Sequence, residues 1–406
     1  MSKTQDFIEL DHRYGAHNYH PLPVVLARAE GAWVWDVEGK RYLDCLSAYS
    51  AVNQGHRHPH IVKALVDQVA TLDLTSRAFH NDVMGHFLEK LCAYTGYEAA
   101  LPMNTGAEAV ETGIKLARRW GYERKGIPAD QAEIVVCEEN FHGRTTTIVG
   151  FSTDPDTRHG FGPATPGFEI IPYDDVPALE RAITDRTCAF LVEPIQGEAG
   201  VRVPADGYLR EARRICSERN VLLIGDEVQT GFCRTGRRFC WMHEDARPDV
   251  LLVGKALGGG LYPVSAALAD WQHMDVFTPG SHGSTFGGNP IGSAVGIAAL
   301  EVLENERLDE RAERLGRQFR DALRTIDRQR VKEVRGKGLL VAIELRDDAG
   351  PARHYCQAMK ERGILAKDTH VHTIRFAPAL VVEEQDLDWA IGVIREVIES
   401  KHPVGS

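Results

Sequence analysis

The chain has 406 residues, 43% of them hydrophobic and 26% charged, with a formal net charge of −11 at pH 7. These values are typical of a globular protein with roughly two or three domains and a large core. The acidic balance argues against a broad basic surface for nucleic acid. No apolar stretch approaches the roughly 20 residues that a membrane span requires. The opening MSKTQDFIEL has no apolar run typical of a signal peptide.

The eight cysteines are scattered along the chain without a CxxC pair. Cys233 and Cys240 are the two nearest, and their spacing is not that of a zinc site. We therefore expect free thiols in a reducing, cytoplasmic environment.

Taken in chain order, the first predicted element is a hairpin at 33–46, with Glu38-Gly39 in its turn. Short apolar runs then predict buried strands, and 208–220 predicts an amphipathic helix between two of them. Alternating strands and helices predict an α/β fold with a mostly parallel sheet covered on both faces. The predicted strands are 133–137, 189–193, 221–227 and 250–255.

The pattern changes after about residue 295. The segment 296–326 predicts one or two long amphipathic helices, 336–345 a strand, and 387–399 a closing helix. We expect a smaller α+β domain here, completed by the N-terminal hairpin. The predicted division is an N-terminal segment 1–50 that joins the small domain, a large domain 51–295, and a C-terminal part 296–406.

Polar residues follow each of the predicted strands. Because ligands bind beyond the carboxyl ends of parallel strands, residues delivered there by several strands predict a site. The four strands lead, in order, to Phe141-His142-Gly143-Arg144, Glu193, Asp226 and Lys255.

Lys255 lies in LLVGKALGGG, after an apolar run and before three glycines. A phosphate-binding P-loop does not fit, because Asp249 and Ala256 occupy the positions of its first glycine and its final Ser or Thr. A lysine at the end of a buried strand can instead be desolvated and form a Schiff base with a carbonyl.

The segment MNTGAEAVETGIKLARR, 103–119, predicts a helix start. Thr105 and Glu108 fit a capping box, and the free N–H groups of Gly106 and Ala107 suit a phosphate. Taken alone, a capped helix without a ligand is the commoner explanation, because capping boxes are frequent.

Asp226 follows Gly225 and an apolar run, where a carboxylate needs a cationic partner such as a protonated ring nitrogen. An ordinary loop acid is an equal alternative for Asp226 alone. Together, however, the residues describe pyridoxal 5'-phosphate: an aldehyde for Lys255, a pyridine nitrogen for Asp226, and a phosphate for Gly106-Ala107.

The chain resembles the class III aminotransferases, which depend on pyridoxal 5'-phosphate and have the fold known as fold type I. The resemblance runs from about Tyr14 to Pro378. It is carried by the segments YGAHNYHPLPV, SAYSAVNQGHRHP, TSRAFHN, LPMNTGAEA, FHGRT, VEPIQGEAGV, GDEVQTGFCRTG, GKALGGGLYPVSA, HGSTFGGNP, VRGKGLL and IRFAP.

The resemblance implies roles for the cofactor contacts. Lys255 would be the Schiff-base lysine and proton carrier, and Asp226 would hold the pyridinium. Ser284 and Thr285 would complete the phosphate site of a neighbouring subunit, which implies a homodimer with shared active sites. Gln229 would bond the ring oxygen, Phe141 would stack on the ring, Gly106 and Ala107 would bind phosphate, and His142 receives no firm role because relatives vary there.

The resemblance is strongest to members that transfer the δ-amino group of ornithine to 2-oxoglutarate, giving glutamate 5-semialdehyde and glutamate. It implies that Tyr19 and Arg144 contact the remote end of the substrate. It also implies that Glu198 pairs with Arg375 until the keto acid binds. Tyr19 and Tyr49 fit the ornithine pattern, although packing near a subunit interface is an alternative for both.

Three alternatives remain open. The amino donor could be acetylornithine, GABA or another ω-amino acid. A metal-dependent hydrolase could use His56, His58 and His60, but Pro59 breaks that run and no acidic cluster accompanies it. A non-catalytic binding protein of the same fold is the third, and the intact Lys255 argues against it.

Overall fold

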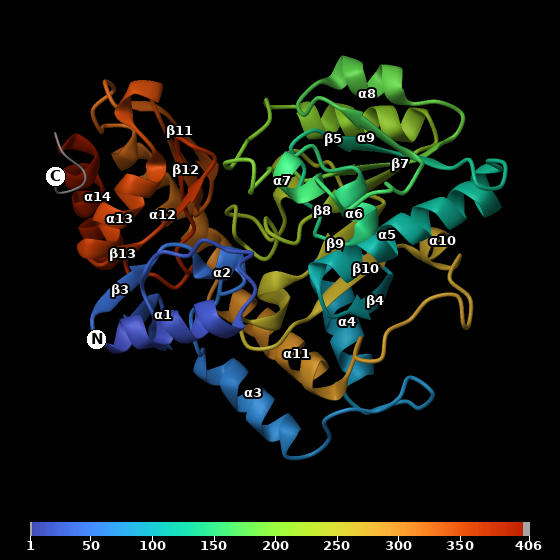
Figure 1. Cartoon of the computed structure of the whole chain (residues 1–406). Helices are drawn as coiled ribbons and strands as arrows, with labels where there is room; N and C mark the ends of the chain where they lie inside the picture. The colour runs from blue at the N-terminus through green and yellow to red at the C-terminus, as the bar shows by residue number, and fades with distance from the viewer. Residues whose placement is uncertain (1, 401–406) are drawn as a thin grey trace.

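A computed structural model describes residues 2–400 of the chain, which form two lobes (Figure 1). The larger lobe is built on a seven-stranded sheet in which β10 alone runs opposite to the other strands. In spatial order its strands are β4 (Ala99–Met103), β10 (Ser265–Ala269), β9 (Val250–Val253), β8 (Leu222–Asp226), β7 (Thr187–Val192), β5 (Glu133–Cys137) and β6 (Phe168–Ile171).

Both faces of this sheet are covered, because successive residues of a strand point to opposite sides. In β5, Ile134 and Val136 pack in the core under α5 (Gly106–Trp120). Val135 and Cys137 pack instead with α8 (Val176–Ala182) and α9 (Tyr208–Glu218). The predicted α/β fold, with a mostly parallel sheet between helices, is confirmed.

The smaller lobe contains two four-stranded sheets. The parallel pairing of β3 with β13 joins the N-terminal hairpin to the C-terminal part of the chain. One sheet has the order β1 (Leu26–Glu30), β2 (Trp33–Asp36), β3 (Arg41–Asp44) and β13 (Ile364–Leu365); the other has β11 (Val331–Lys337), β12 (Leu340–Leu345), β15 (Thr373–Phe376) and β14 (Lys367–Thr369).

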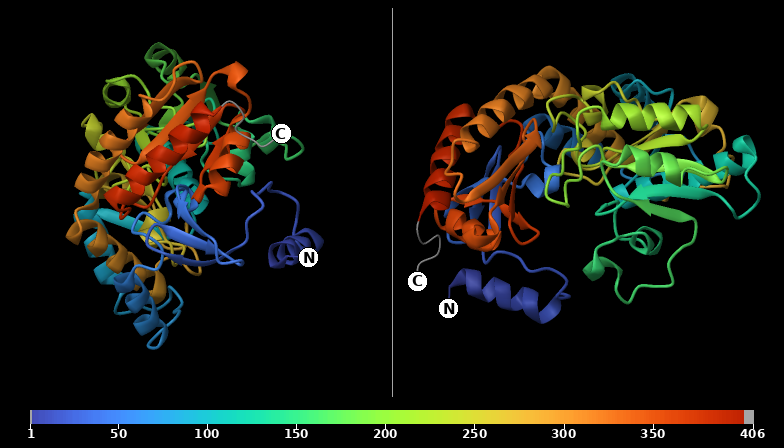
Figure 2. Two further views of the ribbon diagram at one scale, coloured as in Figure 1. Left: turned by 90° about the vertical axis from the view of Figure 1, so that its left-hand side faces the viewer. Right: turned by 90° about the horizontal axis from the view of Figure 1, so that it is seen from above.

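Helices α12 (Leu308–Leu323), α13 (Ala352–Glu361) and α14 (Glu384–Glu399) pack on the smaller lobe. Figure 2 shows α1 (Lys3–Tyr14) lying beside the body of the molecule, and none of its residues is buried. The remaining helices are α2 (Ser47–Ser50), α3 (Pro59–Val69), α4 (Met84–Thr95), α6 (Thr146–Gly150), α7 (Pro155–Arg158), α10 (Trp271–Met274) and α11 (Pro290–Asn305).

The prediction of one strand over 336–345 is wrong, because two strands meet there. β11 ends at Lys337 and β12 begins at Leu340, with Gly338 at φ 53° between them. Glycine adopts this left-handed conformation without a steric penalty, so the chain reverses where a continuous strand was expected. The segment 296–326 contains two helices, α11 and α12, and the predicted domain boundary at 295 falls inside α11.

All eight cysteines are free thiols, as expected from their spacing. Across residues 2–400, no helix is long and apolar enough to cross a membrane.

Candidate active site

A cavity of about 190 Å³ lies at the carboxyl ends of the parallel strands. The sheet therefore brings together the polar residues that follow four separate strands, as the sequence predicts. Lining residues from these strand ends include Phe141, His142, Glu193, Asp226 and Lys255.

Lys255 begins a short 3₁₀ turn, Lys255–Gly258, directly after β9 and Gly254. Its backbone has φ 45°, a left-handed conformation that costs a non-glycine residue about 1–3 kcal/mol and that is concentrated at functional sites. Loss of hydration lowers the pKa of the Lys255 ammonium, although the charge of Glu198 opposes the shift. A lower pKa leaves more neutral amine, the form that attacks a carbonyl.

Asp226 ends β8 and is 5% exposed. Its Oδ2 lies 2.7 Å from Nδ1 of the buried His142, and its Oδ1 accepts a hydrogen bond from Val228 N at 3.1 Å. Burial disfavours the charged His142 imidazole, but the hydrogen bond to Asp226 and the charges of Asp226 and Glu193 together outweigh this and raise the pKa of His142. Nε2 of His142 is buried without a partner among the described residues.

Glu193 follows β7 and is 7% exposed. Its Oε2 accepts a hydrogen bond from Phe141 N at 2.9 Å, which ties the segment after β5 to the end of β7. Burial raises the pKa of Glu193 to about 8, with the charge of His142 opposing the rise. The carboxyl group is therefore mainly protonated at neutral pH.

The predicted capping box at the start of α5 is confirmed. Glu108 N donates to Thr105 Oγ1 at 3.2 Å, and Thr105 N donates to Glu108 Oε2 at 2.7 Å. Gly106 and Ala107, the first two residues of the helix, line the cavity with N–H groups that have no carbonyl partner one turn back. A Cβ atom at Gly106 would lie 2.9 Å from Val228 Cγ1, so glycine allows the helix end to pack closely against Val228, another residue of the cavity wall.

Gln229, Glu198 and Arg375 form one hydrogen-bonded group at the cavity. Arg375 Nη1 donates to Glu198 Oε1 at 2.6 Å, and Gln229 Nε2 donates to the same oxygen at 3.1 Å. Partial burial alone would raise the pKa of Glu198, but the charges of Arg375 and Lys255 lower it to about 2. Glu198 is thus an anion throughout the physiological pH range.

Arg375, on β15 of the small lobe, keeps unused donors. It is 1% exposed, and its Nη1 also donates to Gly197 O at 3.1 Å. Its Nε and Nη2 are buried without a hydrogen-bond partner among residues 2–400. Such a fork is suited to a planar carboxylate.

The structure gathers the other predicted substrate residues around Tyr49. The Arg375 guanidinium lies 5.1 Å from the centre of the Tyr49 ring. Burial raises the pKa of Tyr49, and the nearby Glu198, Arg375, Tyr19 and Arg144 also act on it. Tyr19 is 72% exposed, and the Arg144 guanidinium lies 5.8 Å from the centre of the Phe141 ring, which lines the cavity.

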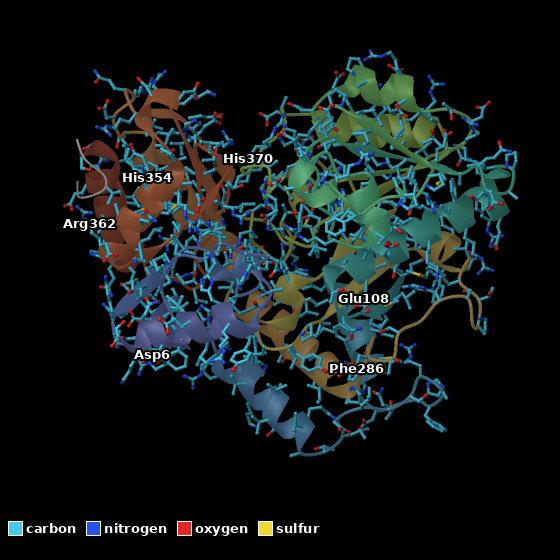
Figure 3. The ribbon with its side chains drawn as sticks, in the orientation of Figure 1. Asp6, Glu108, Phe286, His354, Arg362 and His370 are labelled. Atoms are coloured by element: carbon cyan, nitrogen blue, oxygen red, sulfur yellow. The ribbon has the colours of Figure 1, made fainter. Side chains whose placement is uncertain are left out.

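Ser284 and Thr285 do not line the cavity of Lys255. They border a separate cavity of about 800 Å³ on the loop before α11. Ser284 Oγ accepts a hydrogen bond from Asn104 Nδ2 at 3.0 Å, and Thr285 is exposed. Figure 3 labels their neighbour Phe286 and, on α5, Glu108.

The alternate histidines near α3 do not form a metal site. His56, His58 and His60 bond Asp44, Glu306 and Glu301 respectively, at 2.7–2.8 Å. Within the described part of the chain, no group of three or more His, Cys, Asp or Glu side chains could hold a metal ion. The structure therefore offers no support for the metal-dependent hydrolase.

Sequence reasoning left His142 without a firm role, whereas the structure places it against Asp226. The signal was its position in FHGRT directly beyond a predicted strand, which brings it to the same sheet edge as Asp226. The pairing itself requires the register of β5, β7 and β8, which sequence periodicity does not supply.

Comparisons with known proteins agree with this arrangement. The family model for aminotransferase class-III matches residues 14–398. The curated ornithine aminotransferase of Brevibacillus brevis is 56% identical over 398 residues, 98% of this chain and 99% of the relative.

Two solved structures extend the comparison. An ornithine aminotransferase from Toxoplasma gondii, with partial occupancy of PLP at its active site, superposes with a TM-score of 0.95 and 48% identity, covering 97% of this chain and 93% of its own. An acetylornithine aminotransferase from Elizabethkingia anophelis superposes with a TM-score of 0.89 and 51% identity, covering 98% and 99%. The chain belongs to the aminotransferase class-III family of pyridoxal-phosphate-dependent enzymes.

Proposed function

We propose that this aminotransferase transfers the δ-amino group of L-ornithine to 2-oxoglutarate, giving glutamate 5-semialdehyde and L-glutamate. The observation that carries the proposal is the Arg375–Glu198 ion pair, 2.6 Å long, at the cavity of Lys255. The similarity to curated ornithine aminotransferases over almost the whole chain supports the same donor.

The cavity fits pyridoxal 5'-phosphate. Gln229 Oε1 and His142 Nε2 are buried polar atoms without partners among residues 2–400. A side chain at Gly143 would lie 2.9 Å from Ala107 Cβ, so glycine keeps the wall beside the helix end open. We assign the phosphate to the N–H groups of Gly106 and Ala107, the ring face to Phe141, the ring oxygen to Gln229, the ring nitrogen to Asp226, and the aldehyde to Lys255.

The residues supply positioning and proton transfer. When bound, pyridoxal 5'-phosphate supplies a carbonyl that takes up an amino group and a ring that delocalises the electron pair of a broken C–H bond. Asp226, fixed by His142 and Val228 N, holds a proton on the ring nitrogen through its negative charge. Lys255 Nζ, with its lowered pKa, is placed to take the proton from the substrate carbon and return it.

The two substrates place different demands on Arg375. Ornithine brings its δ-amino end to Lys255, with its carboxylate at the remote end near Tyr19 and Arg144. Arg375 then remains paired with Glu198. 2-Oxoglutarate brings a carboxylate next to its reacting carbon, and Arg375 binds that group through Nε and Nη2, the donors left unused by the pair.

Acetylornithine is the second candidate donor, because the solved structure of an acetylornithine aminotransferase is 51% identical to this chain. Its acetyl group removes the charge of the α-amino group but leaves the δ-amino end unchanged. The two donors therefore differ only at the remote end, to which we assign Tyr19 and Arg144.

We further propose a cytoplasmic homodimer with shared active sites. Thr285 is exposed on a loop that lies outside the Lys255 cavity of its own chain. Ser284 and Thr285 both border the separate cavity beside this loop. Their hydroxyl groups would complete the phosphate site of a second copy.

A donor panel tests the proposal. Amino transfer to 2-oxoglutarate is measured with ornithine, acetylornithine, GABA and lysine, each at several concentrations. Ornithine should have the highest kcat/KM, and a higher kcat/KM for acetylornithine would replace the proposed donor.

A further inference from the structure

Four consecutive residues beside the cavity have left-handed backbone conformations. Ser47, Ala48, Tyr49 and Ser50 have φ values of 48°, 46°, 59° and 71°, and none is glycine. Residues other than glycine visit this region singly, because Cβ approaches the following carbonyl oxygen. Such a run persists only where the surrounding structure determines it, and strain of this kind is concentrated at functional sites.

Asp44 fixes the entry to this left-handed turn. Its Oδ1 accepts hydrogen bonds from Leu46 N and Ser47 N, both at 2.9 Å. Its other oxygen, Oδ2, lies 2.8 Å from Nε2 of His56. Asp44 is 8% exposed, and within residues 2–400 His56 is the one side chain that holds its second carboxylate oxygen.

Two buried amides fix the exit from the turn. Asn53 Nδ2 donates to Phe232 O at 2.8 Å, and Gln54 Nε2 donates to Ala256 O at 2.9 Å. Ala256 is the residue next to Lys255, and the turn itself packs against the segment 255–258. The segment from Asp44 to His56 is therefore held at both ends.

The turn carries Tyr49 into the substrate region. The Tyr49 ring lies 5.1 Å from the guanidinium carbon of Arg375, whose Nη1 is bonded to Glu198. An aromatic face stabilises a nearby cation. Tyr49 thus covers the Arg375 guanidinium while it is paired with Glu198. This paired arrangement is the one proposed for the ornithine half-reaction.

We infer that the Asp44–His56 pair positions Tyr49 through the left-handed turn and thereby helps to select the amino donor. The inference rests on the proposed function. With the pair intact, Tyr49 favours the closed Arg375–Glu198 arrangement and the reaction of ornithine. When His56 no longer holds Asp44, the turn relaxes and Arg375 becomes more accessible to the carboxylate beside the reacting carbon of glutamate.

The test compares three variants of the holoenzyme with wild type. His56→Ala removes the donor to Asp44, His56→Gln retains an amide donor of similar reach, and His60→Ala removes the histidine that bonds Glu301 on α11. The kcat/KM values for the ornithine and glutamate half-reactions give a donor ratio for each protein. His56→Ala should shift this ratio towards glutamate by roughly tenfold, within the range caused by small misplacements of positioning groups.

His56→Gln should recover most of the wild-type ratio, and His60→Ala should leave it unchanged. Glutarate, a dicarboxylate that cannot react, provides a readout independent of turnover, and His56→Ala should bind it more tightly by calorimetry. If His56→Ala does not fold, His56→Asn, whose amide is too short to reach Asp44, takes its place.

An unchanged donor ratio with unchanged glutarate affinity would overturn the inference. So would an equal loss of rate with both donors, because a purely structural role slows them alike. If wild type itself fails to react with ornithine, the proposed function fails instead.

Discussion

His142 Nδ1 lies 2.7 Å from Asp226 Oδ2, and these two residues are only 3% and 5% exposed. A buried carboxylate is stable only when it is hydrogen-bonded, and within residues 2–400 the only other hydrogen bond to the Asp226 carboxylate comes from Val228 N. The pair therefore helps to determine the orientation of the group assigned to the ring nitrogen.

Replacing His142 with phenylalanine should destabilise the protein by about 1–3 kcal/mol, because Asp226 loses a buried partner. The kcat should also fall, since an Asp226 carboxylate that has lost the contact with His142 is less well oriented towards the ring nitrogen. Urea unfolding and steady-state kinetics measure the two effects. His142→Asn, which retains a donor near the position of Nδ1, should lose less of both, and equal losses in the two variants would contradict the assigned role.

Because of Glu193, the free energy of unfolding should decrease as the pH rises. Its pKa is raised from an ordinary value of 4.5 to about 8, so between these values the folded state keeps a proton that the unfolded state has lost. The contribution is complete below pH 4.5 and is lost as pH rises to about 8, with a slope of at most about 1.4 kcal/mol per pH unit.

Glu193→Gln removes this titration. In cofactor-free protein, the unfolding free energy of wild type minus that of the variant should decrease between pH 5 and pH 8. A difference that stays constant over this range would show that Glu193 has an ordinary pKa.

Lys255→Ala should bind the cofactor only non-covalently and should lose nearly all turnover, because both the attacking amine and the proton carrier are absent. Mass spectrometry after borohydride treatment checks the first point: wild type should carry the cofactor on Lys255 and the variant should carry none. Lys63→Ala, at an exposed site paired with Asp67, is the control. Turnover near the wild-type value would remove Lys255 from its catalytic role.

Glu198→Ala should leave Arg375 permanently free for a carboxylate near the reacting carbon. The preference for ornithine over glutamate should fall by about 1–3 kcal/mol, or roughly ten- to a hundredfold in relative kcat/KM. Half-reaction kinetics with each donor measure this change. A loss of the same size for both donors would mean that Glu198 only supports the site.

Much of the large domain follows from the sequence alone. Strand 133–137 and the capped start of α5 have the predicted positions, because apolar runs and a capping box are local signals. Lys255 and Asp226 share a cavity because parallel strands deliver their carboxyl-terminal residues to one edge.

Other features depend on contacts between distant segments. The pairing of His142 with Asp226 spans 84 residues, and the pairing of His56 with Asp44 crosses the left-handed turn. Sequence periodicity contains no signal for four successive left-handed residues, since serine, alanine and tyrosine rarely adopt that conformation. The sequence pattern likewise does not predict the reversal between β11 and β12, because a glycine such as Gly338 can occupy a strand or a turn.

The fate of a labelled nitrogen tests the central claim most directly. The enzyme is incubated with 2-oxoglutarate and L-ornithine that carries ¹⁵N only in its δ-amino group, and the glutamate formed is analysed by mass spectrometry. Transfer from the δ-position predicts glutamate that carries ¹⁵N, together with glutamate 5-semialdehyde. Unlabelled glutamate, or no glutamate from ornithine while acetylornithine reacts, would contradict the proposed function.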